Sequence, residues 1–231
     1  MGSFFGNAPA AGRIAMAALE LSNDRWVEYG AAFTLALSGD SSRARTLVND
    51  MAKRFPEDTS VRFSYLPAVR ARLALNDGDP AKAIALLQVA VPYELGSPRT
   101  ALHANFGALY PVYVRGEAYL AAHQSSQAAA EFQKILDHRG IVLSDPIGAL
   151  AHLQLGRAFA MSGDKTKART AYRISSPSER CRPQHPRPQA SQSGIRHAEL
   201  TRHLSHVVAS NRAARVASGI RYVGELLKRC T

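Results

Sequence analysis

The side chains best suited to chemistry gather near the C-terminal end of this chain. His203 and His206 are three positions apart, close enough to share a metal ion, and His197 and Cys181 lie nearby. No pair of cysteines stands with them, because the other thiol, Cys230, lies 49 positions after Cys181. The same spacing offers neither a disulfide framework nor a zinc motif, which favours a reducing compartment. We therefore expect exposed histidines, with no metal site and no cofactor.

Catalytic constellations are equally absent from the sequence. No Ser, His and Asp, and no Cys and His, stand in a spacing that selects a nucleophile and its base. We interpret Asp137, His138 and Asp145 as residues at helix ends, where they cap the backbone. Asp79-Pro80 and Asp145-Pro146 are typical of helix starts, with proline at the first helical position. The sequence thus predicts that the chain itself is not an enzyme.

A third group of residues indicates binding. These aromatic and polar side chains recur at matching positions of four predicted helices, on the face that we expect to point inward. They are Trp26, Tyr29, Tyr65, Arg72, Asn76, Tyr110, Tyr113, Glu117 and Arg157. Side by side, they would line a concave groove for a partner segment, with Arg72, Glu117 and Arg157 as polar contacts. The alternative is that the aromatic rings simply pack between helices.

The helices that carry these residues follow from a pattern that the chain repeats four times. Each copy has a small residue near the start of its second helix, a small residue twelve positions earlier and a larger one four positions later. The three sets are Ala44, Ala83, Ala128 and Ala168; Ala32, Ala71, Gly116 and Gly156; and Val48, Leu87, Phe132 and Tyr172. Small residues let the two helices of a pair approach closely, and we expect the larger residue to fill the gap between neighbouring pairs.

The turns inside the pairs support this alignment. Gly-Asp occupies the turn in three copies, at Gly39, Gly78 and Gly163, and His123 to Ser126 fill it in the other. Glycine tolerates the left-handed backbone that ends a helix, and aspartate caps the next one.

The pattern resembles the tetratricopeptide repeat, whose period is about 34 residues with the same order of Leu-Gly, Tyr, Ala, Phe and Pro. The family's early tryptophan is absent. The resemblance implies an all-α, right-handed superhelical solenoid of about four helix pairs plus a half repeat, with an irregular C-terminal tail.

Residues 109–120 and 131–140 also resemble the C-terminal repeat region of bacterial signalling proteins with an upstream Ser/Thr kinase or winged-helix domain. The kinase motifs themselves are missing here, since His138-Arg139 is followed by Gly140 instead of aspartate. This resemblance implies a scaffold or sensor module, with any kinase activity in an upstream domain.

The predicted domains follow from where the pattern starts and stops. Residues 1–24 look like a partial repeat with only its second helix, and residues 25–173 form the repeat domain. Residues 174–195 are a linker rich in Pro and Ser, and residues 196–231 are a basic tail. The half repeat suggests a fragment of a longer protein or a misplaced start codon. The abrupt change at 174 suggests a linker with an appended helix or, as we favour, a change of reading frame.

The net charge of +11 belongs mostly to this tail. Residues 174–231 carry ten Lys and Arg against three Asp and Glu, and residues 1–173 carry 19 against 15. Residues 196–228 could form a basic amphipathic helix that binds nucleic acid or an anionic membrane, or an accidental and partly disordered helix. We expect a cytoplasmic chain whose parent protein could be membrane-anchored. Its main partner would be a protein or peptide, with the polyanion function of the tail as the alternative.

Overall fold

The computed structural model describes residues 7–96, 109–143 and 145–175. Among these residues there are helices and turns but no strand. The contacts separate residues 1–176 from residues 177–231, and only the first unit contains described residues. Our predictions for His197, His203, His206 and Cys181, and for the linker and tail beyond residue 175, concern residues outside the described part of the chain.

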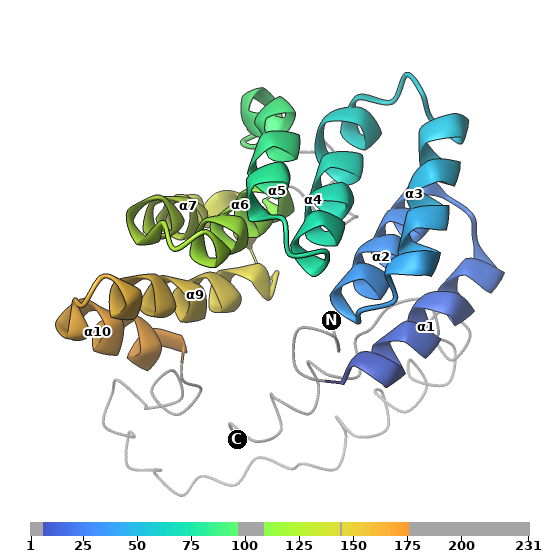
Figure 1. The fold of residues 1–231 in the computed structure, drawn as a ribbon. Helices are drawn as coiled ribbons and strands as arrows, with labels where there is room; N and C mark the ends of the chain where they lie inside the picture. Colours follow the sequence, from blue (N-terminus) through green and yellow to red (C-terminus); the bar gives the residue numbers. More distant parts are fainter. Residues whose placement is uncertain (1–6, 97–108, 144, 176–231) are drawn as a thin grey trace, which may run out of the picture. The chain divides into compact units, whose positions relative to one another are not determined.

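Within that part, four consecutive helix pairs follow a single first helix (Figure 1). Helix α1 (Ala8–Leu21) packs on α2. The pairs are α2 (Arg25–Leu37) with α3 (Ser41–Arg54), α4 (Leu66–Asn76) with α5 (Pro80–Leu87), α6 (Tyr110–Ala121) with α7 (Ser125–Asp137), and α9 (Ile147–Met161) with α10 (Lys165–Ser175). This arrangement confirms the predicted all-α, tetratricopeptide-like solenoid of four pairs plus a half repeat.

The turns within the pairs follow the expected chemistry. Gly39, Gly78 and Gly163 have φ angles of +85°, +79° and +85°, which side-chain-bearing residues rarely adopt. The aspartate after each glycine accepts a hydrogen bond from a backbone N–H three residues later, for example Lys82 N to Asp79 Oδ1 at 2.9 Å. His123 takes φ +57° in the turn without glycine. All four turns therefore contain one residue in the left-handed region.

Close packing inside the pairs explains the small residues of the pattern. A Cβ atom added to Gly116 would lie 2.6 Å from the ring of Phe132, and one added to Gly156 would lie 2.5 Å from the ring of Tyr172. Both rings belong to the second helix of the same pair. Our expectation that the larger residue fills the gap between neighbouring pairs is wrong for these two copies, because the absent glycine side chain leaves room within the pair.

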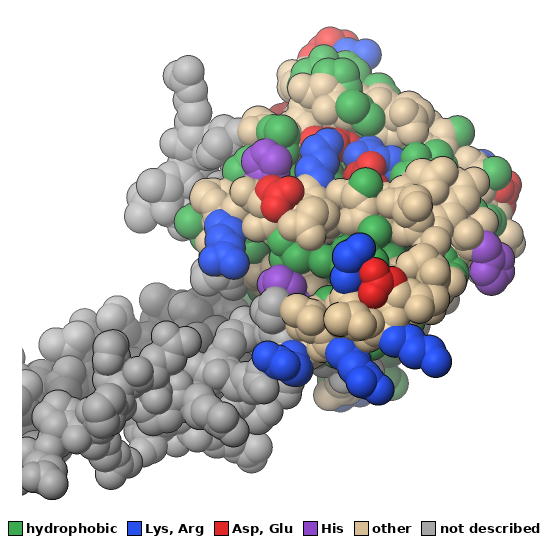
Figure 2. All heavy atoms as spheres, turned by 90° about the vertical axis from the view of Figure 1, so that its left-hand side faces the viewer, with side chains coloured by type: hydrophobic (Ala, Val, Ile, Leu, Met, Phe, Trp, Pro, Cys, Tyr) green, Lys and Arg blue, Asp and Glu red, His purple; other side chains and the backbone are tan. Residues whose placement is uncertain are grey.

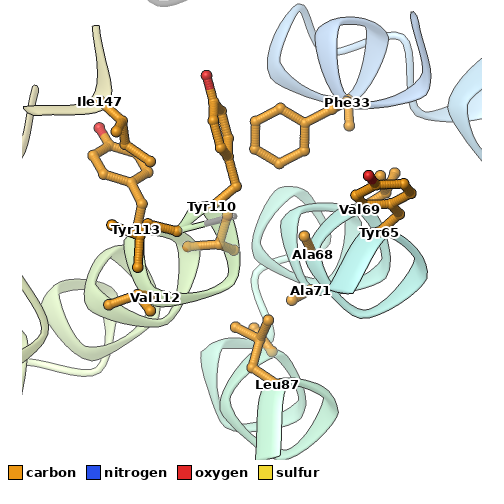
Figure 3. Packing of buried hydrophobic residues seen from close by; sticks show 14 of the residues in the cluster. Phe33, Tyr65, Ala68, Val69, Ala71, Leu87, Tyr110, Val112, Tyr113 and Ile147 are labelled. Atoms are coloured by element: carbon orange, nitrogen blue, oxygen red, sulfur yellow. The ribbon is translucent and has the colours of Figure 1, made fainter. Parts of the chain in front are cut away.

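Each pair contacts the next through both of its helices. The first helices touch one another (α2 with α4, α4 with α6, α6 with α9), and the second helix of each pair touches the first helix of the next (α3 with α4, α5 with α6, α7 with α9). Aromatic rings occupy these junctions. Tyr29 stacks on Tyr65 with ring centroids 4.1 Å apart. Phe33 meets Tyr110 edge-on with ring centroids 5.1 Å apart (Figure 3). The result is one continuous core that runs from α1 to α10.

Shorter elements lengthen the connections between pairs. A π-helical turn, η2 (Val61–Tyr65), leads into α4, and a 3-10 helix, η3 (Gln88–Tyr93), extends α5. The short helix α8 (Arg139–Val142) separates α7 from α9. As predicted, Pro80 is the first residue of α5, whereas α9 begins at Ile147, one residue after Pro146. Residues 97–108, between η3 and α6, lie outside the described part of the chain.

Candidate binding surface on the first helices of the pairs

Four of the nine predicted groove residues lie in the core. Tyr29, Tyr65, Tyr110 and Tyr113 are between 1% and 4% exposed, and their rings pack between the first helices of successive pairs. Burial raises the pKa of all four hydroxyls. These rings offer no open surface to a partner, so the predicted groove is corrected to its polar residues and Trp26. Whether that smaller set binds a partner stays a prediction.

The core position of the tyrosines follows from how the pairs stack. A ring at an inward position of one first helix meets a ring from the element that leads into the next first helix, as Tyr29 of α2 and Tyr65 of η2 do. Stacked and edge-on ring pairs are favourable beyond the area that they bury. The hydroxyl of Tyr110 remains satisfied because it donates to Asp145 Oδ1 at 3.3 Å.

Polar side chains from three consecutive first helices form a connected row. Arg72 of α4 donates to Glu117 Oε2 of α6 at 3.1 Å. Gln154 of α9 donates to Glu117 Oε1 at 3.3 Å and to the Tyr113 hydroxyl at 3.0 Å. Arg157 of α9 then donates to Gln154 Oε1 at 3.1 Å. We call Arg72, Glu117, Gln154 and Arg157 the polar row.

The charges of the polar row are partly shielded from water. The side chains of Arg72 and Glu117 are 23% and 17% exposed. Burial raises the pKa of Glu117, although the opposing charge of Arg72 pulls it back down. Within the described residues, Nε of Arg72 is buried and has no hydrogen-bond partner. Two guanidinium groups against one carboxylate leave the row with a positive excess and with unused donors, which suits an oxygen-rich ligand.

The remaining two predicted residues lie on α2 and at the C-terminal end of α4. Trp26 is half-buried, with its ring 5.6 Å from that of Tyr65 and the Arg25 guanidinium 5.4 Å from its centroid. Asn76 donates to the carbonyl of Ala36 at 2.7 Å and so ties α4 to the end of α2. The structure therefore unites Arg72, Glu117 and Arg157 in the row and gives Asn76 a role in joining two pairs.

Gln154 is the member of the row that our sequence reasoning missed. It lies two positions before Gly156, and the matching residues in the other copies are Gly30, Val69 and Val114. The sequence signal that could have revealed Gln154 is its polar side chain, because the other three copies have a glycine or a valine at this position. Gln154 is 6% exposed, and a buried amide needs partners, which Glu117 and Tyr113 supply.

Metal binding and membrane insertion were also considered for the described residues. No group of three or more His, Cys, Asp and Glu side chains in the described ranges is placed to hold a metal ion. No helix among the described residues has the length and apolar character required to cross a membrane. Figure 2 shows Lys and Arg side chains gathered along one edge of the face on the side of α7, α9 and α10.

A comparison with known families agrees with the fold. A model described as tetratricopeptide repeat matches residues 113–183, a range that includes most of α6 and all of α7, α9 and α10. No curated protein and no solved structure matches the chain. The match and the four stacked pairs together support a tetratricopeptide-repeat protein, and repeats of this kind generally mediate protein–protein interaction.

Proposed function

We propose that residues 25–173 act as a protein-interaction module that binds a partner segment along the polar row. The observation that carries this proposal is the chain of hydrogen bonds from Arg72 through Glu117 and Gln154 to Arg157. It holds four polar side chains in fixed positions across three rigid helices. Preorganised donors of this kind reduce the entropy that a complex loses when it forms.

The chemistry of the row defines the partner's contact groups. Arg157 is exposed and uses only one of its donors within the described structure, so its other N–H groups are open to a ligand. Carboxylate or amide oxygens of a bound segment would satisfy these donors. Trp26 offers an apolar and aromatic surface on α2, the first helix of the first pair. The proposed ligand is therefore a protein segment with acidic or amide side chains and an apolar residue.

The resemblance to signalling proteins gives this module its proposed setting. In a bacterial signalling protein, the module would act as a scaffold or sensor and would leave catalysis to an upstream domain. The repeat fold supports a non-enzymatic role for the chain itself.

A photo-crosslinking amino acid placed at position 157 tests the proposal in cells that express the chain. The matched control carries the same group at Arg169, an exposed residue of α10 outside the row. We expect a discrete adduct from position 157 and none from position 169. With the captured partner purified, Arg157→Ala should weaken its binding at least tenfold, and Arg169→Ala should not change it. The same adducts from both positions would contradict the assignment of the row.

A further inference from the structure

A groove of about 270 Å³ lies between α3, α4 and α5. Its floor is apolar, with Leu73 and Ala74 from α4, Val48 from α3 and Leu86 from α5. Its rim is polar, formed by Arg45, Asn49, Arg70, Asp77 and Lys82. The groove includes no residue of the polar row, so it is a separate surface of the same repeats.

The rim has more positive than negative charge. Arg45 binds Asp77 through both carboxylate oxygens, at 2.8 and 2.6 Å, and these two residues neutralise each other. Arg70 and Lys82 are exposed, and neither side chain has a hydrogen-bond or ion-pair partner in the described part of the chain. The groove therefore presents two uncompensated cations above an apolar floor.

The next helix pair shows what such an arginine binds when carboxylates are available. Arg70 directly precedes Ala71, and Arg115 directly precedes Gly116, so the two arginines occupy the same position of the repeat. Arg115 is 3% exposed and forms ion pairs with Glu94 and with Glu131, the latter at 2.6 Å. This position can therefore hold a fully engaged arginine, provided that carboxylates face it.

The residues around Arg70 explain why it lacks a counterpart of Glu131. Glu131 lies three positions after Ala128, and the residue three positions after Ala83 is Leu86, which lines the groove. A leucine thus replaces the carboxylate that the neighbouring pair supplies from its own second helix. The replacement leaves Arg70 uncompensated and adds an apolar side chain to the floor.

We propose that this groove binds an acidic segment of a partner protein. A carboxylate of that segment would contact Arg70, as Glu131 contacts Arg115, and a second acidic group would pair with Lys82 at the rim. An aliphatic side chain beside them would rest on Leu73 and Leu86. The apolar floor favours a peptide over a nucleic-acid backbone, which offers phosphates but no aliphatic side chain. This inference does not rest on the proposed function of the polar row.

Selection from a phage-displayed library of short random peptides tests the proposal on the full chain. The library is first depleted on the double variant Arg70→Glu and Lys82→Glu, which retains the basic tail and so removes peptides that bind only there. We expect the unaltered chain to enrich peptides that combine acidic residues with leucine or another aliphatic residue. Both substituted residues are exposed and unpaired, so the variant should fold, which circular dichroism checks.

Affinities of a selected peptide, measured by fluorescence anisotropy, complete the test. The double variant should bind at least about tenfold more weakly, because it reverses both rim charges. The control pair Lys53→Glu and Arg169→Glu changes the net charge equally outside the groove and should leave the affinity within about threefold. Leu86→Glu should also abolish binding, since it gives Arg70 an internal carboxylate like Glu131.

Four results would overturn the proposal. The first two are failure to enrich any peptide and enrichment of peptides without acidic residues. The third is an equal loss of affinity in the double variant and in the control pair. The fourth is displacement of the peptide by a single-stranded oligonucleotide to the same extent from the double variant and from the control pair. The last result would assign the binding to general polyanion attraction.

Discussion

Substitution of Gly116 by alanine tests how closely the two helices of a pair must approach. The added Cβ atom would lie 2.6 Å from the ring of Phe132, which is fully buried and also contacts Tyr113 edge-on at 5.8 Å. Because this ring cannot move without disturbing the core, the overpacking should cost about 1–3 kcal/mol. Alanine in a helix interior regains about 1 kcal/mol over glycine. The net loss of stability should be about 1 kcal/mol, or about 2–4 °C in melting temperature.

Two further glycines provide graded comparisons for this prediction. At Gly156 the added Cβ atom would lie 2.5 Å from the ring of Tyr172, but that residue is 36% exposed and can swing outward. Gly156→Ala should therefore cost less than Gly116→Ala, despite the shorter distance. At Gly12 the nearest atom is Leu35 Cδ2 at 4.0 Å, an ordinary contact, so Gly12→Ala should stabilise the chain through helix propensity alone.

Thermal and urea unfolding, followed by circular dichroism at the helix band, would rank the three variants. The expected order of stability is Gly12→Ala, then Gly156→Ala, then Gly116→Ala. The double variant Gly116→Ala with Phe132→Leu should show a coupling energy, because the smaller side chain removes the clash. If Gly116→Ala were as stable as Gly12→Ala, the helices of the pair would be further apart than we describe, and the packing argument would fail.

Other predictions concern single features of the chain. Burial raises the pKa of Glu28 to about 7, above the usual 4.5, so stability should fall as the pH rises between these values; Glu28→Gln should remove that fall in urea unfolding midpoints compared at about pH 5 and 8. His123→Gly should raise the melting temperature, since a left-handed backbone costs a residue with a side chain about 1 kcal/mol. Glu94→Gln should lower the unfolding free energy by about 3 kcal/mol, because it leaves a buried arginine with one fewer carboxylate, whereas Glu57→Gln at an exposed pair should change it by less than about 1 kcal/mol. Removal of residues 176–231 should abolish retention on heparin at moderate salt, since most of the excess positive charge lies there; retention of the shortened chain would place the basic surface on the repeats instead.

The fold was predictable because its signals are local. The glycine and aspartate of a turn act within a few residues, and the backbone angles of Gly39 and Gly163 match what their sequence context demands. Likewise, the spacing between Gly116 and Ala128 identifies the two helices of one pair, although the position of the Phe132 ring within that pair was not predicted. The repeat pattern therefore contained enough information for four pairs and a single additional helix.

The candidate site was less predictable because it depends on contacts between pairs. Helical periodicity places Tyr29 and Tyr65 on inward faces, but only the stacking of neighbouring helices shows that the two rings cover each other. Gln154 was missed for a related reason, since its hydrogen-bond partners come from α6. The short helix α8 also gave no signal, because its four residues contain too little periodicity to detect.

Arg70 and Arg72 show how one helix can take part in two surfaces. Residues two apart on an α-helix are separated by roughly 200° around its axis, so their side chains leave the helix on nearly opposite sides. Arg72 accordingly joins the polar row through Glu117, and Arg70 lies at the rim of the groove between α3 and α5. A variant of either arginine should therefore affect one surface and spare the other. That separation makes the two proposals independently testable on the same folded chain.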